Sequence, residues 1–142
     1  MPDLLNPSQT TLAYLAGIID GEGSIGVYKA NNSHKVVVTV KMCDPEAVGE
    51  IHEYFGGSAS GYQGTNAYVF RVYLAADSAY QFLKAIRKFL RVKAEQADWA
   101  IEFHETCKPG KGHPITPEVA ALQFEYATIL KDLKKLPYEW EV

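Results

Sequence analysis

Apolar residues recur along the chain at two alternating spacings, one typical of helices and the other of strands. Leu12, Leu15 and Ile19 recur at helical spacing, which predicts a helix over residues 7–20 with Asn6 as its N-cap. The spacing then changes to every second residue, which is the period of a half-buried strand. The order of the two spacings therefore indicates the order of the elements.

Two hairpins are predicted where the spacing is two. Alternating residues over 25–28 and 35–42 flank the turn sequence NNS, and a second alternating pair fills residues 56–74. Helical spacing predicts further helices at about 45–55, 77–90, 93–106 and 116–133. The order helix, hairpin, helix, hairpin and then helices predicts an α+β fold, with a largely antiparallel sheet covered by helices on one face.

The composition fits a single globular domain that spans residues 1–142. Hydrophobic residues make up 47% and charged residues 22% of the chain, which is ordinary for such a domain. No apolar run reaches the roughly 18 residues that span a bilayer, and the N-terminus lacks the basic-then-apolar order of a signal peptide. Cys43 and Cys107 lack CxxC spacing and fit buried thiols in a reducing compartment. We expect an intracellular protein without a membrane partner, in the cytoplasm or, if organelle-encoded, in an organelle.

Charge is distributed unevenly along the chain. The formal net charge of −3 argues against a nucleic-acid partner, but residues 23–43 contain no acid and carry Lys29, His34, Lys35 and Lys41. Strand alternation places a polar to basic set on the sheet face away from the core, namely Tyr28, Lys35, Val37, Thr39, Lys41, Ser58, Ser60, Tyr62, Val69, Arg71 and Tyr73. Such a face can lie against DNA, because paired strands fit the major groove. A plain solvated sheet face is the alternative.

The sequence LAGIIDGEG at residues 15–23 resembles the signature of the LAGLIDADG homing endonucleases. Ile18, Gly21 and Glu22 stand for the leucine, the alanine and the second aspartate of the signature, and the other letters match. The predicted order αββαββα is similar to that of the family, and FLRVKAEQADWAI at 89–101 is similar to its helix after the second hairpin. The resemblance covers roughly residues 8–105.

The resemblance implies an endonuclease core at about 8–105, a C-terminal helical extension at about 106–142, and a homodimer. In the family, the signature helices of two domains or two subunits pack together, and this chain has one copy. The implied dimer interface comprises Leu12, Ala13, Ala16, Gly17 and Asp20, whose small members let two helix backbones approach closely. The alternative is that Gly17 accommodates a neighbouring element of its own chain. Two-fold symmetry predicts a near-palindromic double-stranded DNA target.

The resemblance also assigns roles near the end of the signature helix. Glu22 corresponds to the metal ligand, with the Gly21 carbonyl as a second ligand and Mg²⁺ or Mn²⁺ as the cofactor. A divalent cation offsets the repulsion between two carboxylates that meet across the dimer axis. Lys93 falls at the family's basic catalytic position, and a solvated lysine at a helix start is the alternative. Asp44 falls where the family organises active-site water, and it also suits the N-cap of the next helix. Asp20 is expected to have a structural role at the helix end.

The implied function is that of a homodimeric, site-specific and metal-dependent DNA endonuclease. It would hydrolyse one phosphodiester bond on each strand across the minor groove and leave short 3′ overhangs, with no small-molecule substrate. The outward sheet face, together with Lys29 and His34, would bind the DNA. Such proteins are typically encoded within introns or inteins. A non-cleaving binder on the same scaffold, either an intron RNA maturase or a DNA-binding regulator, is the alternative.

Overall fold

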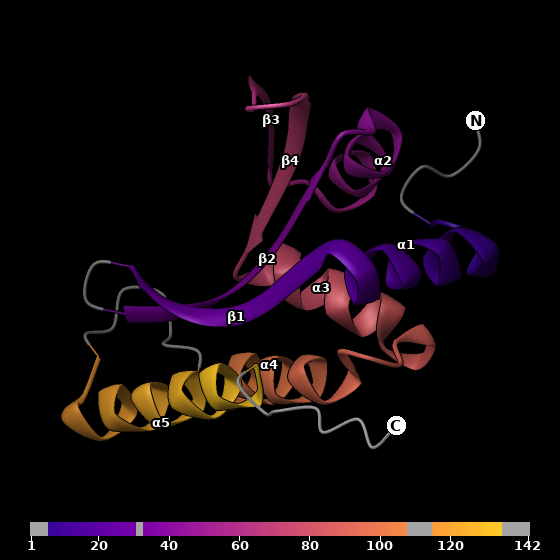
Figure 1. Cartoon of the computed structure of the whole chain (residues 1–142). Coiled ribbons are helices and arrows are strands. Elements are labelled where there is room, and N and C mark those ends of the chain that lie inside the picture. Colours follow the sequence, from indigo (N-terminus) through magenta and orange to yellow (C-terminus); the bar gives the residue numbers. More distant parts are fainter. Residues whose placement is uncertain (1–5, 31–32, 108–114, 135–142) are drawn as a thin grey trace, which may run out of the picture.

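A computed structural model describes residues 6–30, 33–107 and 115–134. The elements follow in the order α1 (Gln9–Glu22), β1 (Gly23–Ala30), β2 (Ser33–Met42), α2 (Pro45–Phe55), β3 (Ser58–Gln63), β4 (Tyr68–Ala75), α3 (Asp77–Ile86), the 3-10 helix η1 (Arg87–Phe89), α4 (Ala94–Cys107) and α5 (Pro117–Leu133). The elements from α1 to α3 follow the predicted αββαββα order (Figure 1).

The four strands form one antiparallel sheet in the order β1-β2-β4-β3. Ile25 of β1 pairs with Val38 of β2, which in turn pairs with Leu74 of β4, so these apolar side chains share one face. β3 joins the other edge of β4 through the pair Ala59 and Val72. Successive residues of a strand point to opposite faces, and this register therefore sends the intervening polar residues to the other face. The predicted α+β fold is confirmed.

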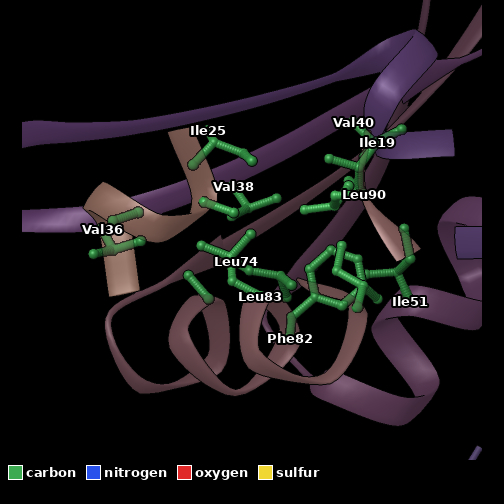
Figure 2. Close-up of a cluster of buried hydrophobic side chains, with 14 of the residues drawn as sticks. Ile19, Ile25, Val36, Val38, Val40, Ile51, Leu74, Phe82, Leu83 and Leu90 are labelled. Carbon is green, nitrogen blue, oxygen red and sulfur yellow. The ribbon is translucent and has the colours of Figure 1, made fainter. Parts of the chain in front are cut away.

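The core lies between the apolar sheet face and the helices. Figure 2 shows Ile25, Val38 and Leu74 of the sheet above Phe82 and Leu83 of α3, and all five are at most 1% exposed. Burying a large aliphatic or aromatic side chain contributes about 1.5–3 kcal/mol relative to leaving it in water. Contacts of this kind hold the helices against one side of the sheet and leave its other side uncovered by them.

The helices α4 and α5 extend the helical layer beyond α3. They lie side by side, and α5 also contacts β1 and β2 (Figure 1). Gln123 fixes α5 in place, since this fully buried amide accepts the backbone N–H of His34 at 3.1 Å and donates to the Cys107 carbonyl at 3.1 Å. In the described residues, each helix is too short or too polar to cross a membrane.

The first helix begins two residues later than the sequence pattern indicates. Ser8, and not Asn6, is the N-cap of α1, because its hydroxyl accepts the backbone N–H of Thr11 at 3.1 Å. Pro7 therefore precedes the N-cap and is not the first helical residue. The N-cap predicted at Asp44 is confirmed, and Thr116 is the N-cap of α5.

Candidate functional site

The sheet face away from the helices brings together side chains from all four strands. Lys35 pairs with Tyr28, and Thr39 pairs with Tyr73, which pairs in turn with Ser58. The next row joins Lys41, Arg71 and Ser60, and the last pairs Val69 with Tyr62. The register therefore places all the outward-facing residues expected from strand alternation on one face. This face, hereafter the outward face, contains no acidic residue from the four strands.

Three residues expected to bind DNA lie elsewhere or are covered. Val37 is on the outward face but only 5% exposed, so it offers little surface to a ligand. Lys29 and His34 pair with each other on the opposite face, because each stands an odd number of residues from the outward-facing positions. The strands thus place these two residues on the side of the sheet that carries the helices, which narrows the predicted DNA-binding set.

Glu22 is the last residue of α1 and is exposed. Its side chain borders a hollow of about 280 Å³ that is also lined by Lys41, Met42, Cys43 and Val69. The carboxylate therefore lies at the margin of the outward face, next to its basic row. A negative charge at the last turn of a helix is disfavoured by about 0.3–1 kcal/mol, so this position has an electrostatic cost in the free protein.

A tight turn from α1 into β1 presents Glu22 at this margin. The backbone N–H of Gly23 bonds to the Ile19 carbonyl and ends the helix. A Cβ atom on Gly23 would lie 2.8 Å from Ile19 Cδ1 and 2.9 Å from Ile19 Cα. These contacts are too close for any side chain, so glycine is required where the chain leaves the helix.

Asp20 is engaged by a loop far away in the sequence. Its carboxylate accepts the backbone N–H groups of Arg91, Val92 and Lys93, at 2.9, 3.1 and 2.9 Å. These residues lead directly into α4, so the carboxylate also faces the N-terminal end of a helix, where negative charge is favoured. Asp20 therefore has the geometry of a structural residue, and its carboxylate is already committed within its own chain.

Lys93 is brought to the end of α1 by the same contact. Its Nζ donates to the Asp20 backbone carbonyl at 2.7 Å. Burial lowers the pKa of Lys93, while the nearby negative charges of Asp20 and Glu22 raise it and the positive charge of Lys134 lowers it further. Two of the predicted catalytic residues, Glu22 and Lys93, thus share one electrostatic neighbourhood although they are far apart in sequence.

Asp44 serves as the N-cap of α2. Its Oδ1 accepts the backbone N–H of Glu46 at 2.8 Å, and its φ and ψ of −100° and 124° are those of an N-cap residue. It follows Cys43, which lines the hollow beside Glu22. The capping role is thus confirmed, and a role in organising water stays a prediction.

The exposed side of α1 differs in part from the expected dimer interface. Leu12 is 7% exposed and Ala16 is fully buried in the core of their own chain, so neither can present its side chain to a second copy. Ala13, Gly17 and Gly21 are exposed at helical spacing and form a stripe of small residues that ends beside Glu22. Of the residues expected at the interface, Ala13 and Gly17 are therefore the exposed ones on α1, and the interface itself stays a prediction. Tyr14, 49% exposed on the same side, was not anticipated.

Two further residues near Glu22 were missed at the level of sequence. Ser24 continues the alternation of Tyr28 and faces outward, paired with Thr39, so extending the predicted strand by one residue finds it. Lys134 follows α5 and donates to the Tyr28 hydroxyl at 3.0 Å. No periodicity or motif marks it, because only the packing of α5 against β1 brings it to this place.

The oxygen donors at the end of α1 suit a hard divalent cation. Such cations prefer carboxylate and carbonyl oxygens, and Glu22 offers the first while the last helical turn has carbonyls without helical partners. The Ile19 carbonyl accepts a hydrogen bond from the Gly23 backbone N–H, and the Asp20 carbonyl accepts one from Lys93. The Gly21 carbonyl is therefore the next candidate for a second ligand. Within the described residues, no group of three or more His, Cys, Asp or Glu side chains gathers as a metal site.

Solved structures of homing endonucleases share this fold. The chain is similar to I-CvuI, described in complex with a DNA target, with a TM-score of 0.71 and 17% identity over 93% of this chain and 87% of that one. It is also similar to the archaeal intron-encoded I-Vdi141I in complex with DNA, with a TM-score of 0.68 and 21% identity over 94% of this chain and 89% of that one. The match to the meganuclease I-SmaMI has a TM-score of 0.64 and 16% identity, and it covers 92% of this chain but 48% of that one.

These similarities define the class of the fold. The chain has the fold of the homing endonucleases, and the resemblance to the LAGLIDADG type that its sequence suggested is confirmed at that level. No protein-family model and no curated protein matches the sequence.

Proposed function

We propose that the protein is a homodimeric, site-specific DNA endonuclease of the LAGLIDADG type that uses Mg²⁺ or Mn²⁺. In this proposal residues 1–142 act as one endonuclease domain, and the signature helices of two copies pack together. The two Glu22 carboxylates then meet at one end of the paired helices, and the two outward faces form one continuous surface for double-stranded DNA. A near-palindromic target follows from the two-fold symmetry.

The observation that carries the proposal is the empty space beside the glycines of α1. A Cβ atom built on Gly17 or Gly21 meets nothing within 4 Å. Within the described residues, the alternative that Gly17 accommodates a neighbour of its own chain therefore has no support. Glycine in a helix costs about 1 kcal/mol relative to alanine, so two unneeded glycines in one exposed stripe favour close approach by a second helix.

The match to I-SmaMI supports the same arrangement. This chain spans about half the length of that protein, as expected for a unit that works in pairs. Among the similar structures, I-CvuI is described in complex with DNA in the presence of Mg in one case and Ca in another. A divalent cation between the two Glu22 carboxylates would fit this pattern and would relieve the cost of their charges.

The residues around Glu22 suit phosphodiester hydrolysis. A bound Mg²⁺ or Mn²⁺ would polarise the phosphate and lower the pKa of a bound water. Glu22 and the Gly21 carbonyl would hold the cation, and Lys93 would place positive charge, or a base, beside the reacting phosphate. The Asp20 contacts fix the backbone of Lys93, so its ammonium is positioned before DNA arrives. The outward face orients the duplex through Lys41, Arg71 and the hydroxyl groups beside them.

Cleavage of a randomised DNA library tests the proposal. The wild-type protein is expected to cut a subset of duplexes on both strands in Mg²⁺, and Glu22→Gln is expected to bind the same duplexes without cutting. Glu53→Gln, the same substitution at an exposed position of α2, serves as a control for the loss of one negative charge and is expected to cut as the wild type does. Binding without cleavage by the wild type would instead indicate the non-cleaving alternative, an RNA maturase or a regulator.

A further inference from the structure

Lys134 links α5 to the outward face at the edge nearest Glu22. Its Nζ donates to the Tyr28 hydroxyl at 3.0 Å and to Ser24 Oγ at 3.4 Å, and it lies 5.4 Å from the centre of the Tyr28 ring. Both partners face outward, since Ser24 pairs with Thr39 and Tyr28 with Lys35. The lysine thus carries its ammonium from the helical layer past the edge strand β1 to the other face of the sheet.

The positive charge of Lys134 is not neutralised within the described part of the chain. Its partners there are two hydroxyls and an aromatic ring, and the ion pairs involve other residues. The strands contribute no acid to the face on which the ammonium lies. An ammonium that is held in place yet unpaired is available to an anion that approaches this face.

Lys134 also lies close to the proposed cleavage site. Ser24, one of its hydrogen-bond partners, is only two residues beyond Glu22. The positive charge of Lys134 lowers the pKa of Lys93, as burial does, and the negative charge of Glu22 raises it. The two ammonium groups, carried by different elements, therefore act on each other near the end of α1.

We propose that Lys134 contacts a DNA backbone phosphate beside the cleavage site, so that α5 completes the DNA-binding surface from outside the αββαββα core. This inference rests on the proposed function. A phosphodiester is the anion that an unpaired ammonium on this face would meet when a duplex lies on it. Neutralising a phosphate releases condensed counterions, which gives the contact a measurable dependence on salt.

A structural role alone makes a different prediction. If Lys134 only tied α5 to β1, its loss would lower stability without changing the salt dependence of DNA binding. Lys134→Met separates the two roles, because it keeps a flexible apolar side chain of similar length and removes the charge. Lys134→Arg restores the charge. Lys88→Met is the matched control, since the Lys88 ammonium also lies over a ring, that of Phe89 at 5.1 Å, but belongs to η1.

The test measures binding to a duplex that the wild-type protein selects from a randomised library, in Ca²⁺ and over a range of KCl concentrations. For Lys134→Met, the slope of log K against log[KCl] is expected to become shallower by about 0.9 for each phosphate contact that is lost. Each protomer is expected to lose one such contact. Lys134→Arg and Lys88→Met are expected to retain the wild-type slope, and urea unfolding checks that each variant is folded.

The outcomes separate this inference from the proposed function. A wild-type slope for folded Lys134→Met, in a protein that binds and cuts DNA, would overturn the role of Lys134 and leave the proposed function in place. A wild-type protein that selects no duplex at all would overturn both. A shallower slope that arginine restores supports the phosphate contact.

Discussion

Asp20 and Glu22 stand two residues apart at the end of α1, and their surroundings give them different tasks. The Asp20 carboxylate accepts three backbone N–H groups from residues 91–93, whereas Glu22 is exposed at the margin of the outward face. The Asp20 carboxylate is satisfied within its own chain and holds Lys93 in place. The negative charge of Glu22 is disfavoured at the end of the helix, which fits the proposed role in binding a cation and not a role in stability.

Replacing Asp20 with alanine is expected to lower the free energy of unfolding by about 2 kcal/mol, because three amides lose a charged acceptor at a partly solvated site. Asp20→Asn keeps one acceptor oxygen and should lose less. Glu22→Gln, the neighbouring control, removes a disfavoured charge and should leave stability unchanged or raise it by up to about 1 kcal/mol. Urea unfolding followed by circular dichroism measures all three, and equal losses for Asp20→Ala and Glu22→Gln would contradict the division of roles.

Residue-level reasoning from the sequence reached some of these roles and not others. The signature indicated Glu22 and a structural Asp20, and strand alternation placed Lys41 and Arg71 on the outward face. The partners of Asp20 could not be predicted, because they are 71 to 73 residues away and depend on how the loop before α4 returns to α1. Lys134 was missed for the same reason.

At the scale of elements, the loop that carries Lys93 is fixed at both of its ends. Asp20 binds its backbone, and Arg87 of η1 forms a two-point ion pair with Asp98 of α4, with Arg87 Nη2 at 2.8 Å from Asp98 Oδ2 and a second bond from Nε. The hydrogen bond from Arg87 holds the pKa of Asp98 below its ordinary value. The short segment between η1 and α4 is thus braced from two directions.

The Arg87–Asp98 pair should make stability depend on pH. A depressed carboxyl pKa contributes stability above the unfolded value, near pH 4, and this contribution is lost as the pH falls through the folded value. Because both side chains are more than a third exposed, the expected contribution is at most about 1 kcal/mol. Asp98→Asn should lower stability at pH 7 and flatten its decline below pH 4, as measured by urea unfolding at several pH values.

A matched control for that prediction is Lys84→Met. Lys84 is 4.0 Å from Glu105 with both side chains about half exposed, so its pair is weaker than that of Arg87. Its loss should leave the decline in stability below pH 4 as it is in the wild type. An unchanged decline in Asp98→Asn would contradict the role given to the Arg87–Asp98 pair.

The exposed stripe of α1 gives a prediction for association. Gly17→Leu is expected to leave the single chain folded, since a Cβ at this position meets nothing within 4 Å, and to abolish the dimer by blocking helix approach. Gly49→Leu is the control, because Gly49 of α2 is also helical, exposed and free of neighbours within 4 Å. Sedimentation velocity is expected to show a monomer for Gly17→Leu and a dimer for Gly49→Leu. The same state for both variants would contradict the interface.

Element-level prediction from sequence succeeded where the pattern is local. Apolar alternation found both hairpins and the outward face, and helical spacing found the helices of the described residues, with α3 and η1 predicted as one. The start of α1 was placed two residues early, because Asn6 and Ser8 are both good caps and only the bond from Thr11 distinguishes them. On α1, the small residues Ala13 and Ala16 look alike in sequence, and only packing shows that Ala16 is buried and Ala13 exposed.

At the scale of the whole molecule, the chain supplies one half of the DNA-binding surface of the proposed dimer. One side of the sheet is occupied by helices, and the other is free of strand-borne acid and bordered by Glu22, Lys93 and Lys134. An acidic chain can therefore carry a basic face, because the described acids other than Glu22 lie in the helices or, for Asp44, at a helix N-cap. A second copy joined along α1 would double this surface and place one Glu22 from each protomer at its centre.

A mixed dimer tests this arrangement most directly. Wild-type and Glu22→Gln chains that carry different tags are purified together as a heterodimer and incubated in Mg²⁺ with a duplex that the wild type cleaves. Because each protomer is proposed to supply one carboxylate to a shared centre, the heterodimer should make far fewer double-strand breaks than the wild-type homodimer and leave mostly nicked or intact duplex. Double-strand cleavage at the wild-type rate by the heterodimer would contradict a site built from two Glu22 residues.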